Sequence, residues 1–428
     1  MTHPSMGPRP VETARSEQVR RDARWADLER LRSSNPMLDA VIDEVQGRRI
    51  RVGEHWLSDF ASSSYLGFDQ DPEIIDSVVR QLGRWGTHAG RSRLIGSPRL
   101  FTQIEEELAA LIGAPDTLVL PSVTDIHTSV IPLFAGRGQV FVDAMAHQAI
   151  YDGCSVATSQ GASLHRFRPN DAEHLEELLQ AAPADSSKLV CIHGVNRLTG
   201  NVADVAAFAA VAREHNARLY VDDGDGFGVV GERSPDELTP YGISGNGALR
   251  HAGEDYDHVV VVGSFANGYS SPLSFLALPT HLKSYLKVTA TPYLYSGPAS
   301  TAALAGVLAG FTVNRSRGEQ IRLGLFQKTQ RVLSRLAELR VHTTNTDGLP
   351  IIELPVVHPT DLHEVGTHLF ERGIWATLAA YPLVPRSHVG VRIQVTAAHT
   401  EGDVDLLGEV LGEVVGRFSL SPAARDNS

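Results

Sequence analysis

The chain has 428 residues and a formal net charge of −12, with 42% hydrophobic and 21% charged residues. Such a chain can bury a large core, and its composition is ordinary for a globular protein. The negative charge and the scattered arginines argue against nucleic acid or an anionic membrane surface as a partner. No apolar run could span a bilayer, no signal-peptide pattern is present, and the only cysteines are Cys154 and Cys191, so we expect a cytoplasmic protein.

Residues 1–55 are expected to form an N-terminal arm. A charged helical pattern runs from Glu12 to Arg32, and it places Trp25, Leu28 and Leu31 at helical spacing as a narrow docking stripe.

Residues 56–300 alternate between short apolar runs and helical patterns. The runs expected as strands are Leu118–Leu120, Val140–Val142, Leu189–Ile192, Leu219–Val221 and Val259–Val262, with helices such as Ala172–Ala182 and Val205–His215 between them. The valine run is apolar on both faces, as a central strand covered by helices requires. This order predicts a large α/β domain with a mainly parallel central sheet.

The pattern changes after Ser300. A long helical segment reaches Leu339, and it is followed by the apolar run IIELPVV, a helix from Thr360 and a further strand and helix. This order predicts a smaller α+β C-terminal domain over residues 301–420, and we expect residues 421–428 to be a disordered tail.

Five stretches carry recognisable motifs: LSDFASSSYLGF at 57–68, the glycine-rich loop and helix at 86–113, VFVDAMAHQAIYDG at 140–153, YVDDGDGFGVVG at 220–231 and GSFANG at 263–268. Together they resemble the α-oxoamine synthases, which include the amino-oxononanoate synthases. These are fold type I transferases that use pyridoxal phosphate (PLP) to condense an amino acid with an acyl thioester. The resemblance runs from about Asp59 to Leu411, and it implies a homodimer with the cleft near the subunit boundary.

The turn GSFANG departs from the family at one decisive position. The family has a lysine there, which carries PLP as a Schiff base, and this chain has Asn267. An amide nitrogen cannot form an imine, because its lone pair is delocalised into the carbonyl. The lysines of the chain precede a strand or fall on expected surface helices, so none is a convincing replacement: Lys188, Lys283, Lys287 and Lys328.

Other family contacts are also replaced. Val123 takes the place of a glycine at the helix start that cradles the cofactor phosphate, and Asp125 adds a carboxylate nearby. Asp225 replaces the histidine that contacts the ring hydroxyl. Ala380 replaces the arginine that clamps the amino-acid carboxylate.

The remaining polar residues are expected to converge on one cleft. Asp222 keeps the position that pairs with the pyridine nitrogen, His147 the position that stacks on the ring, and Ser264 a further vestigial PLP position. His193 and Arg197 replace a glutamate and a serine of the family. We expect His193, His147, Asp222, Asp225 and Asn267 to be catalytic, and His127, Arg197, Tyr65 and Ser296 to contact substrate.

These residues favour a PLP-independent acyltransferase that needs no cofactor and moves an acyl group from a coenzyme A or carrier-protein thioester to an amine or hydroxyl. His193 is the predicted general base, oriented by Asp222 or Asp225, and His147 mainly a positioning residue. Asn267 or an amide near Gly268 would donate to the thioester carbonyl.

Two alternatives stay open: an enzyme that binds PLP or its amine form non-covalently, and a non-catalytic pseudoenzyme or scaffold partner. Cys191 lies two residues before His193 and could be a nucleophile, although a buried strand cysteine is the commoner case. The histidines and carboxylates lack the spacing of metal ligands, so no metal is expected.

Overall fold

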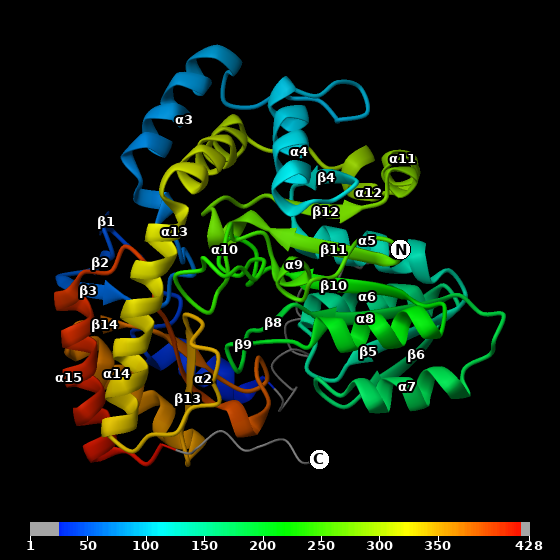
Figure 1. Cartoon of the computed structure of the whole chain (residues 1–428). Coiled ribbons are helices and arrows are strands. Elements are labelled where there is room, and N and C mark those ends of the chain that lie inside the picture. Colours follow the sequence, from blue (N-terminus) through cyan, green and yellow to red (C-terminus); the bar gives the residue numbers. More distant parts are fainter. Residues whose placement is uncertain (1–24, 421–428) are drawn as a thin grey trace, which may run out of the picture.

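The computed structural model describes residues 25–420. A seven-stranded sheet forms its centre, in the order β4-β12-β11-β10-β7-β5-β6 (Figure 1). All its strands are parallel except β12, which pairs antiparallel with both neighbours. The strands are β4 (Asp116–Leu120), β5 (Gln139–Asp143), β6 (Ser163–Phe167), β7 (Lys188–His193), β10 (Arg218–Asp223), β11 (Val259–Ser264) and β12 (Ser274–Leu278). The predicted α/β class and mainly parallel sheet are confirmed.

Helices cover both faces of this sheet (Figure 1). Val260 and Val262 of β11 pack into the cluster formed with α5 (Val123–Ala135) and α6 (Gln148–Ser159). Val259 and Val261 face the larger cluster on the opposite side, where α7 (Ala172–Ala181) and α8 (Val205–Glu214) lie. Because side chains alternate along a strand, the valine run fills both layers of the core.

The long helix α13 (Thr301–Glu338) connects the two ends of the molecule (Figure 1). It packs against α3 (Pro72–Trp85) and α4 (Arg99–Ile112) at one end and against α15 (Glu401–Arg417) at the other. Beyond it, β13 (Ile351–Pro355), β16 (Gly390–Gln394) and β15 (Thr377–Ala379) form a three-stranded antiparallel sheet, with α14 (Leu362–Glu371) beside it.

The first described residues join this C-terminal part. Strands β1 (Glu44–Gln46), β2 (Arg49–Val52) and β3 (His55–Asp59) form a sheet that β14 (Ile374–Trp375) completes through parallel pairing with β3. Helix α2 (Ala26–Ser34) buries Leu31 within the same chain. Leu31 of the expected docking stripe is therefore already covered, so it has no exposed surface left to bury on a partner.

The remaining short elements connect these layers: β8 (Val195–Asn196), β9 (Asn201–Val202), α9 (Ala248–His251), α10 (Phe265–Gly268), α11 (Thr280–Thr289), α12 (Thr291–Leu294) and three 3₁₀ turns at Phe68–Gln70, Pro359–Asp361 and Arg386–His388. The expected helix start at Glu12 and the expected tail at 421–428 lie outside the described residues. The domain boundaries stay a prediction.

Candidate active site

A cavity of about 290 Å³ lies at the carboxyl ends of the parallel strands. His193 ends β7, Asp222 lies at the end of β10 and Ser264 ends β11, so the sheet brings these residues to one edge. The other lining residues are Ser63, Val123, His147, Val195, Arg197, Gly224, Asp225, Asn267 and Gln394. The cavity brings together the predicted residues His147, His193, Asp222, Asp225 and Asn267, and Gln394 was not predicted from the sequence.

Asp222 is held ionised by a chain of hydrogen bonds. His127 Nε2 lies 3.2 Å from Asp222 Oδ2, and His127 Nδ1 lies 2.8 Å from the Tyr220 hydroxyl. Burial alone would raise the pKa of Asp222, but the hydrogen bonds from His127 and from the Gly224 amide outweigh burial and hold this pKa well below its usual range. His127 is fully buried and does not line the cavity, so its predicted contact with substrate is wrong. It supports Asp222 instead.

His147 and His193 are linked through the backbone. His147 is the N-cap of α6, its amide donates to His193 Nε2 at 2.9 Å, and its own Nδ1 accepts from the Ala149 amide. Burial, with a smaller effect from Arg197, lowers the pKa of His147 to about 4, so its ring is neutral at pH 7. His147 therefore presents an Nε2–H donor to the cavity.

The predicted role of His193 as general base does not fit this geometry. Its Nε2 lone pair already accepts from the His147 amide, so the neutral ring carries its proton on Nδ1 and has no free basic nitrogen. The carboxylates expected to orient it have other partners: Asp222 accepts from His127, and Asp225 from Tyr65 and Asn267. His193 fixes the start of α6.

Asn267, Asp225 and Tyr65 form a closed group. The Asn267 side-chain amide donates to Asp225 Oδ1 at 2.7 Å and to the Gly224 carbonyl at 3.1 Å, and the Tyr65 hydroxyl donates to the same Asp225 oxygen. Both amide protons of Asn267 are used, so it cannot also donate to a thioester carbonyl as predicted. Tyr65 is fully buried outside the cavity lining, so its predicted substrate contact is also wrong.

The remaining predicted residues divide into two groups. Ser264 and Arg197 line the cavity, and the Ser264 hydroxyl accepts from the Ala266 amide. Ser296 lies in the connection between α12 and α13 and is not among the residues that line the cavity. Cys191 is fully buried on the face covered by α5 and α6 beside Cys154, and burial raises the pKa of its thiol, so it is not a nucleophile of this cavity.

Asp223, which follows Asp222, went unnoticed in the sequence. It points to the opposite side of β10, accepts a hydrogen bond from the Ala248 amide, and leaves Oδ1 buried without a partner among the described residues. Burial and the nearby carboxylates of Asp222 and Asp225 raise the pKa of Asp223 to about 8. Two adjacent carboxyl groups are thus held in opposite protonation states at pH 7.

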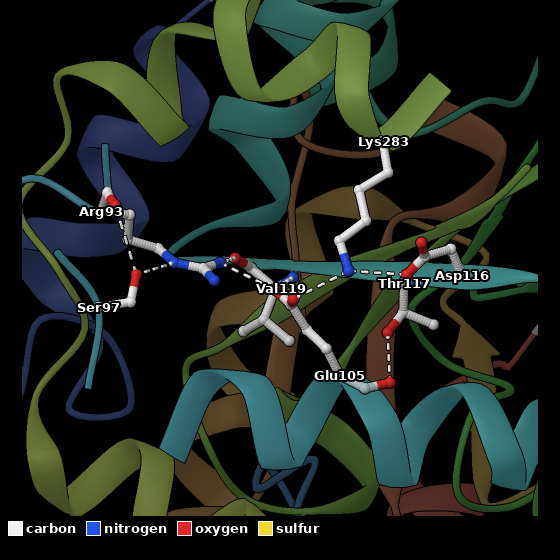
Figure 2. Close-up of polar contacts among 7 residues, drawn as sticks. All are labelled: Arg93, Ser97, Glu105, Asp116, Thr117, Val119 and Lys283. Carbon is white, nitrogen blue, oxygen red and sulfur yellow. Dashed lines mark hydrogen bonds and ion pairs between the residues drawn. The ribbon is translucent and has the colours of Figure 1, made fainter. Parts of the chain in front are cut away.

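No lysine of residues 25–420 lines the cavity. Lys283 lies instead in a network on the edge strand β4, 2.7 Å from Asp116 and 3.1 Å from Glu105 (Figure 2). Lys328 donates to the Ala397 carbonyl, and Lys188 to carbonyls at the far end of β7. Lys287 lies on α11, beside the same edge of the sheet. None replaces the missing lysine.

The residues suit the ring and phosphate of PLP but not its covalent attachment. Asp222 supplies an anion and His147 a neutral ring. The start of α5 reaches the cavity at Val123, close to Ser264, and the Asp125 amide of the same turn donates to the Ser122 hydroxyl. The Asp125 side chain, expected to oppose a phosphate, belongs to an exposed residue that does not line the cavity. The amine at position 267 is missing, as are the family's histidine and arginine at the positions of Asp225 and Ala380.

Residues 25–420 contain no helix that is long and apolar enough to cross a membrane. In the same part of the chain, no three histidine, cysteine or carboxylate side chains come together as metal ligands.

Comparison with solved structures supports the fold. A lysine-to-alanine variant of serine palmitoyltransferase from S. paucimobilis, solved with bound PLP–myriocin aldimine, superposes with a TM-score of 0.84 over 95% of this chain and 100% of that one, at 20% identity. The fold is therefore that of a fold type I PLP-dependent transferase, as the resemblance implied.

Curated relatives are more similar in sequence. An 8-amino-7-oxononanoate synthase from Saccharophagus degradans is 32% identical over 87% of this chain and 91% of its own length. A serine palmitoyltransferase from Bacteroides ovatus is 26% identical over 86% of this chain and 90% of its own length. These findings overturn two expectations, that the protein is a PLP-independent acyltransferase and that it uses no cofactor, because its relatives are PLP-dependent enzymes.

The model of one family, aminotransferase class I and II, matches residues 57–411, which hold the central sheet, the cavity and the C-terminal sheet. The identity to the S. degradans synthase over most of both chains agrees with that match. The chain belongs to the class I and II aminotransferase family, among the relatives of 8-amino-7-oxononanoate synthase and serine palmitoyltransferase.

Proposed function

We propose that this protein is a PLP-dependent enzyme that joins an amine-bearing substrate to the acyl group of a coenzyme A or carrier-protein thioester, acting as a homodimer. The observation that carries the proposal is the buried Asp222, kept as a carboxylate at the cavity by His127 and the Gly224 amide. His127 and the Gly224 amide stabilise this buried anion, and Asp222 still lines the cavity, where it can pair with a cationic group of a ligand. The protonated pyridine nitrogen of PLP is a matching partner.

Four features of the cavity would hold the cofactor. Asp222 would keep the proton on the pyridine nitrogen, and the neutral His147 would lie against the ring and offer its Nε2–H as a donor. Ser264 and the first amides of α5 would receive the phosphate, because helix N-termini bind anions. When bound, PLP withdraws electrons from an attached amine and acidifies its neighbouring C–H bond.

Asn267 determines how the cofactor is held. Its amide cannot bond covalently to PLP, so non-covalent contacts with the ring and phosphate must retain the cofactor. An amine substrate would therefore not have to displace a lysine from PLP. The S. paucimobilis relative supports this view, because that protein holds a PLP adduct as a lysine-to-alanine variant.

The acyl donor is inferred from the relatives. Serine palmitoyltransferase is named for transfer of a palmitoyl group to serine, and both relatives cover most of this chain. An acyl thioester is therefore the proposed second substrate.

Thiol release from a panel of acyl thioesters, in the presence of amino acids and with or without PLP, tests the proposal. We expect release that needs both PLP and an amine, and a loss of about a hundredfold or more in Asp222→Asn. Asp236→Asn, a change at an exposed residue outside the cavity, is the matched control and should keep the wild-type rate. Release without PLP, or release unchanged in Asp222→Asn, would contradict the proposal.

A further inference from the structure

Arg197 stands out among the arginines of the described chain. It lies in the turn between β8 and β9, where Asn196 Oδ1 accepts from the amides of Leu198 and Thr199, and the Asn196 carbonyl accepts from the Gly200 amide. Gly200 has a φ of +70°, and an added Cβ would meet the Ile351 carbonyl oxygen at 2.3 Å. The backbone that carries Arg197 is thus fixed on both sides.

The Arg197 guanidinium lines the cavity but makes no hydrogen bond or ion pair with any residue of 25–420. Arg197 itself is half-buried. The fully buried arginines Arg93 and Arg322 are paired within the protein, Arg93 with Glu105 and Arg322 with Asn314 and Glu319. Five N–H donors beside a cavity, without a partner in the protein, indicate a partner from outside.

The carboxylates of the cavity are not partners of the Arg197 guanidinium. Asp222 is bonded to His127 and the Gly224 amide, and Asp225 to Tyr65 and Asn267. Arg197 is the only arginine or lysine among the lining residues, His147 is neutral, and His193 Nε2 already accepts from the His147 amide. An anionic group of a ligand is the partner that remains.

The anion is more consistent with a carboxylate than with the cofactor phosphate. The proposed phosphate contacts, the start of α5 and the Ser264 hydroxyl, lie on other elements than Arg197. The fork of a guanidinium matches the two oxygens of a carboxylate. Ala380, where the family resemblance would place an arginine for this purpose, is buried and offers no charge.

We infer that Arg197 binds the carboxylate of the amine substrate and thereby selects amino acids over simple amines. This inference rests on the proposed function. The residue that binds the carboxylate would then lie in the β8–β9 turn rather than at the position of Ala380 in the C-terminal part.

Two stable cofactor adducts test the inference by calorimetry. Phosphopyridoxyl-glycine and phosphopyridoxyl-methylamine share the ring, phosphate and amine, and differ only in the carboxylate. We expect the wild-type protein to bind the glycine adduct about tenfold to a hundredfold more tightly, as charge-assisted hydrogen bonds imply. Arg197→Gln should remove this preference without weakening the methylamine adduct, and Arg197→Lys should keep part of it.

Arg80→Gln, at an exposed position of α3, is the matched control and should keep the wild-type preference. Thermal melting of each variant checks that it is folded. Equal wild-type affinity for the two adducts would overturn the inference and leave the proposed function standing. Equal weakening of both adducts by Arg197→Gln would overturn it too, because the arginine would then contact the ring or phosphate. If neither adduct binds the wild-type protein, the proposed function fails, and the inference fails with it.

Discussion

Asn267 and Asp225 occupy the positions where the family resemblance places a lysine and a histidine, and they are hydrogen-bonded to each other at 2.7 Å. The two replacements therefore belong together, because the amide donates to the carboxylate and Tyr65 donates to the same oxygen. A lysine introduced at position 267 alone would form an ion pair with Asp225, which would hold its amine protonated and unreactive.

This pairing gives a prediction about restoring covalent attachment. We expect Asn267→Lys alone to gain little PLP that borohydride can fix to the chain, whereas Asn267→Lys combined with Asp225→His should gain clearly more. Intact mass after borohydride reduction measures both. Complete labelling of the single variant would show that Asp225 does not restrain the new lysine.

Asp223 gives a prediction about pH and stability. Its pKa of about 8 lies above the ordinary value of 3.8, so the folded state keeps a proton that the unfolded state releases. The free energy of unfolding should therefore fall as pH rises from about 4 to about 8, by at most about 1.4 kcal/mol per pH unit from this group. Asp223→Asn mimics the protonated acid and should be more stable than wild type at pH 8 but similar at pH 4.

Urea unfolding of both proteins across this pH range measures the difference. The comparison cancels the other titrating groups, because they are common to both proteins. Parallel pH profiles would show that Asp223 is already ionised in the folded state.

At the scale of elements, the edge strand β4 is held by one charged network (Figure 2). Glu105 of α4 accepts from Arg93 at 2.9 Å and from the Val119 amide at 3.0 Å, and lies 3.1 Å from Lys283 of α11. Its backbone carbonyl accepts from Thr117. The glycine-rich loop, α4, β4 and α11 therefore meet at a single carboxylate.

We predict that Glu105→Ala lowers the free energy of unfolding by about 3–5 kcal/mol, because Arg93 would remain buried without a counter-charge. Glu107→Ala is the matched control on the same helix. Its pair with Arg315 is exposed, so its loss should cost at most about 1 kcal/mol. Chemical unfolding measures the free energy of unfolding of both variants. An equal decrease in the two variants would mean that the buried network contributes no more to stability than a surface pair.

The sequence predicted elements better than contacts. The five expected parallel strands are present because runs such as 259–262 are apolar on both faces, a pattern that the chain itself displays. The antiparallel β12 was not predicted, since its direction depends on the turn after α10. The roles of His127 and His193 could not be predicted either, because their partners Tyr220 and the His147 amide are distant in sequence.

At the scale of the whole molecule, one apolar patch indicates self-association. Leu94 and Ile95 of the glycine-rich loop are 60% and 79% exposed, and Tyr295 is 81% exposed. The Ser92 hydroxyl donates to the Leu294 carbonyl, which joins the two segments. Large exposed apolar groups gathered in this way usually mark an interface.

We therefore predict a homodimer in solution. Analytical ultracentrifugation should give a dimer at micromolar concentration for wild type, and Ile95→Asp combined with Tyr295→Asp should shift it toward monomer. Val357→Asp, at an exposed valine elsewhere on the surface, should stay dimeric. A monomeric wild-type protein would contradict the proposed assembly.

We propose that the cavity around Asp222 binds PLP although no lysine lines it. Titration of the purified protein with PLP, followed by borohydride reduction and intact mass, tests both parts directly. We predict saturable binding that Asp222→Asn weakens, together with an unchanged chain mass after reduction. Absence of saturable binding, or a pyridoxyl group fixed to Lys188, Lys283, Lys287 or Lys328, would contradict the claim.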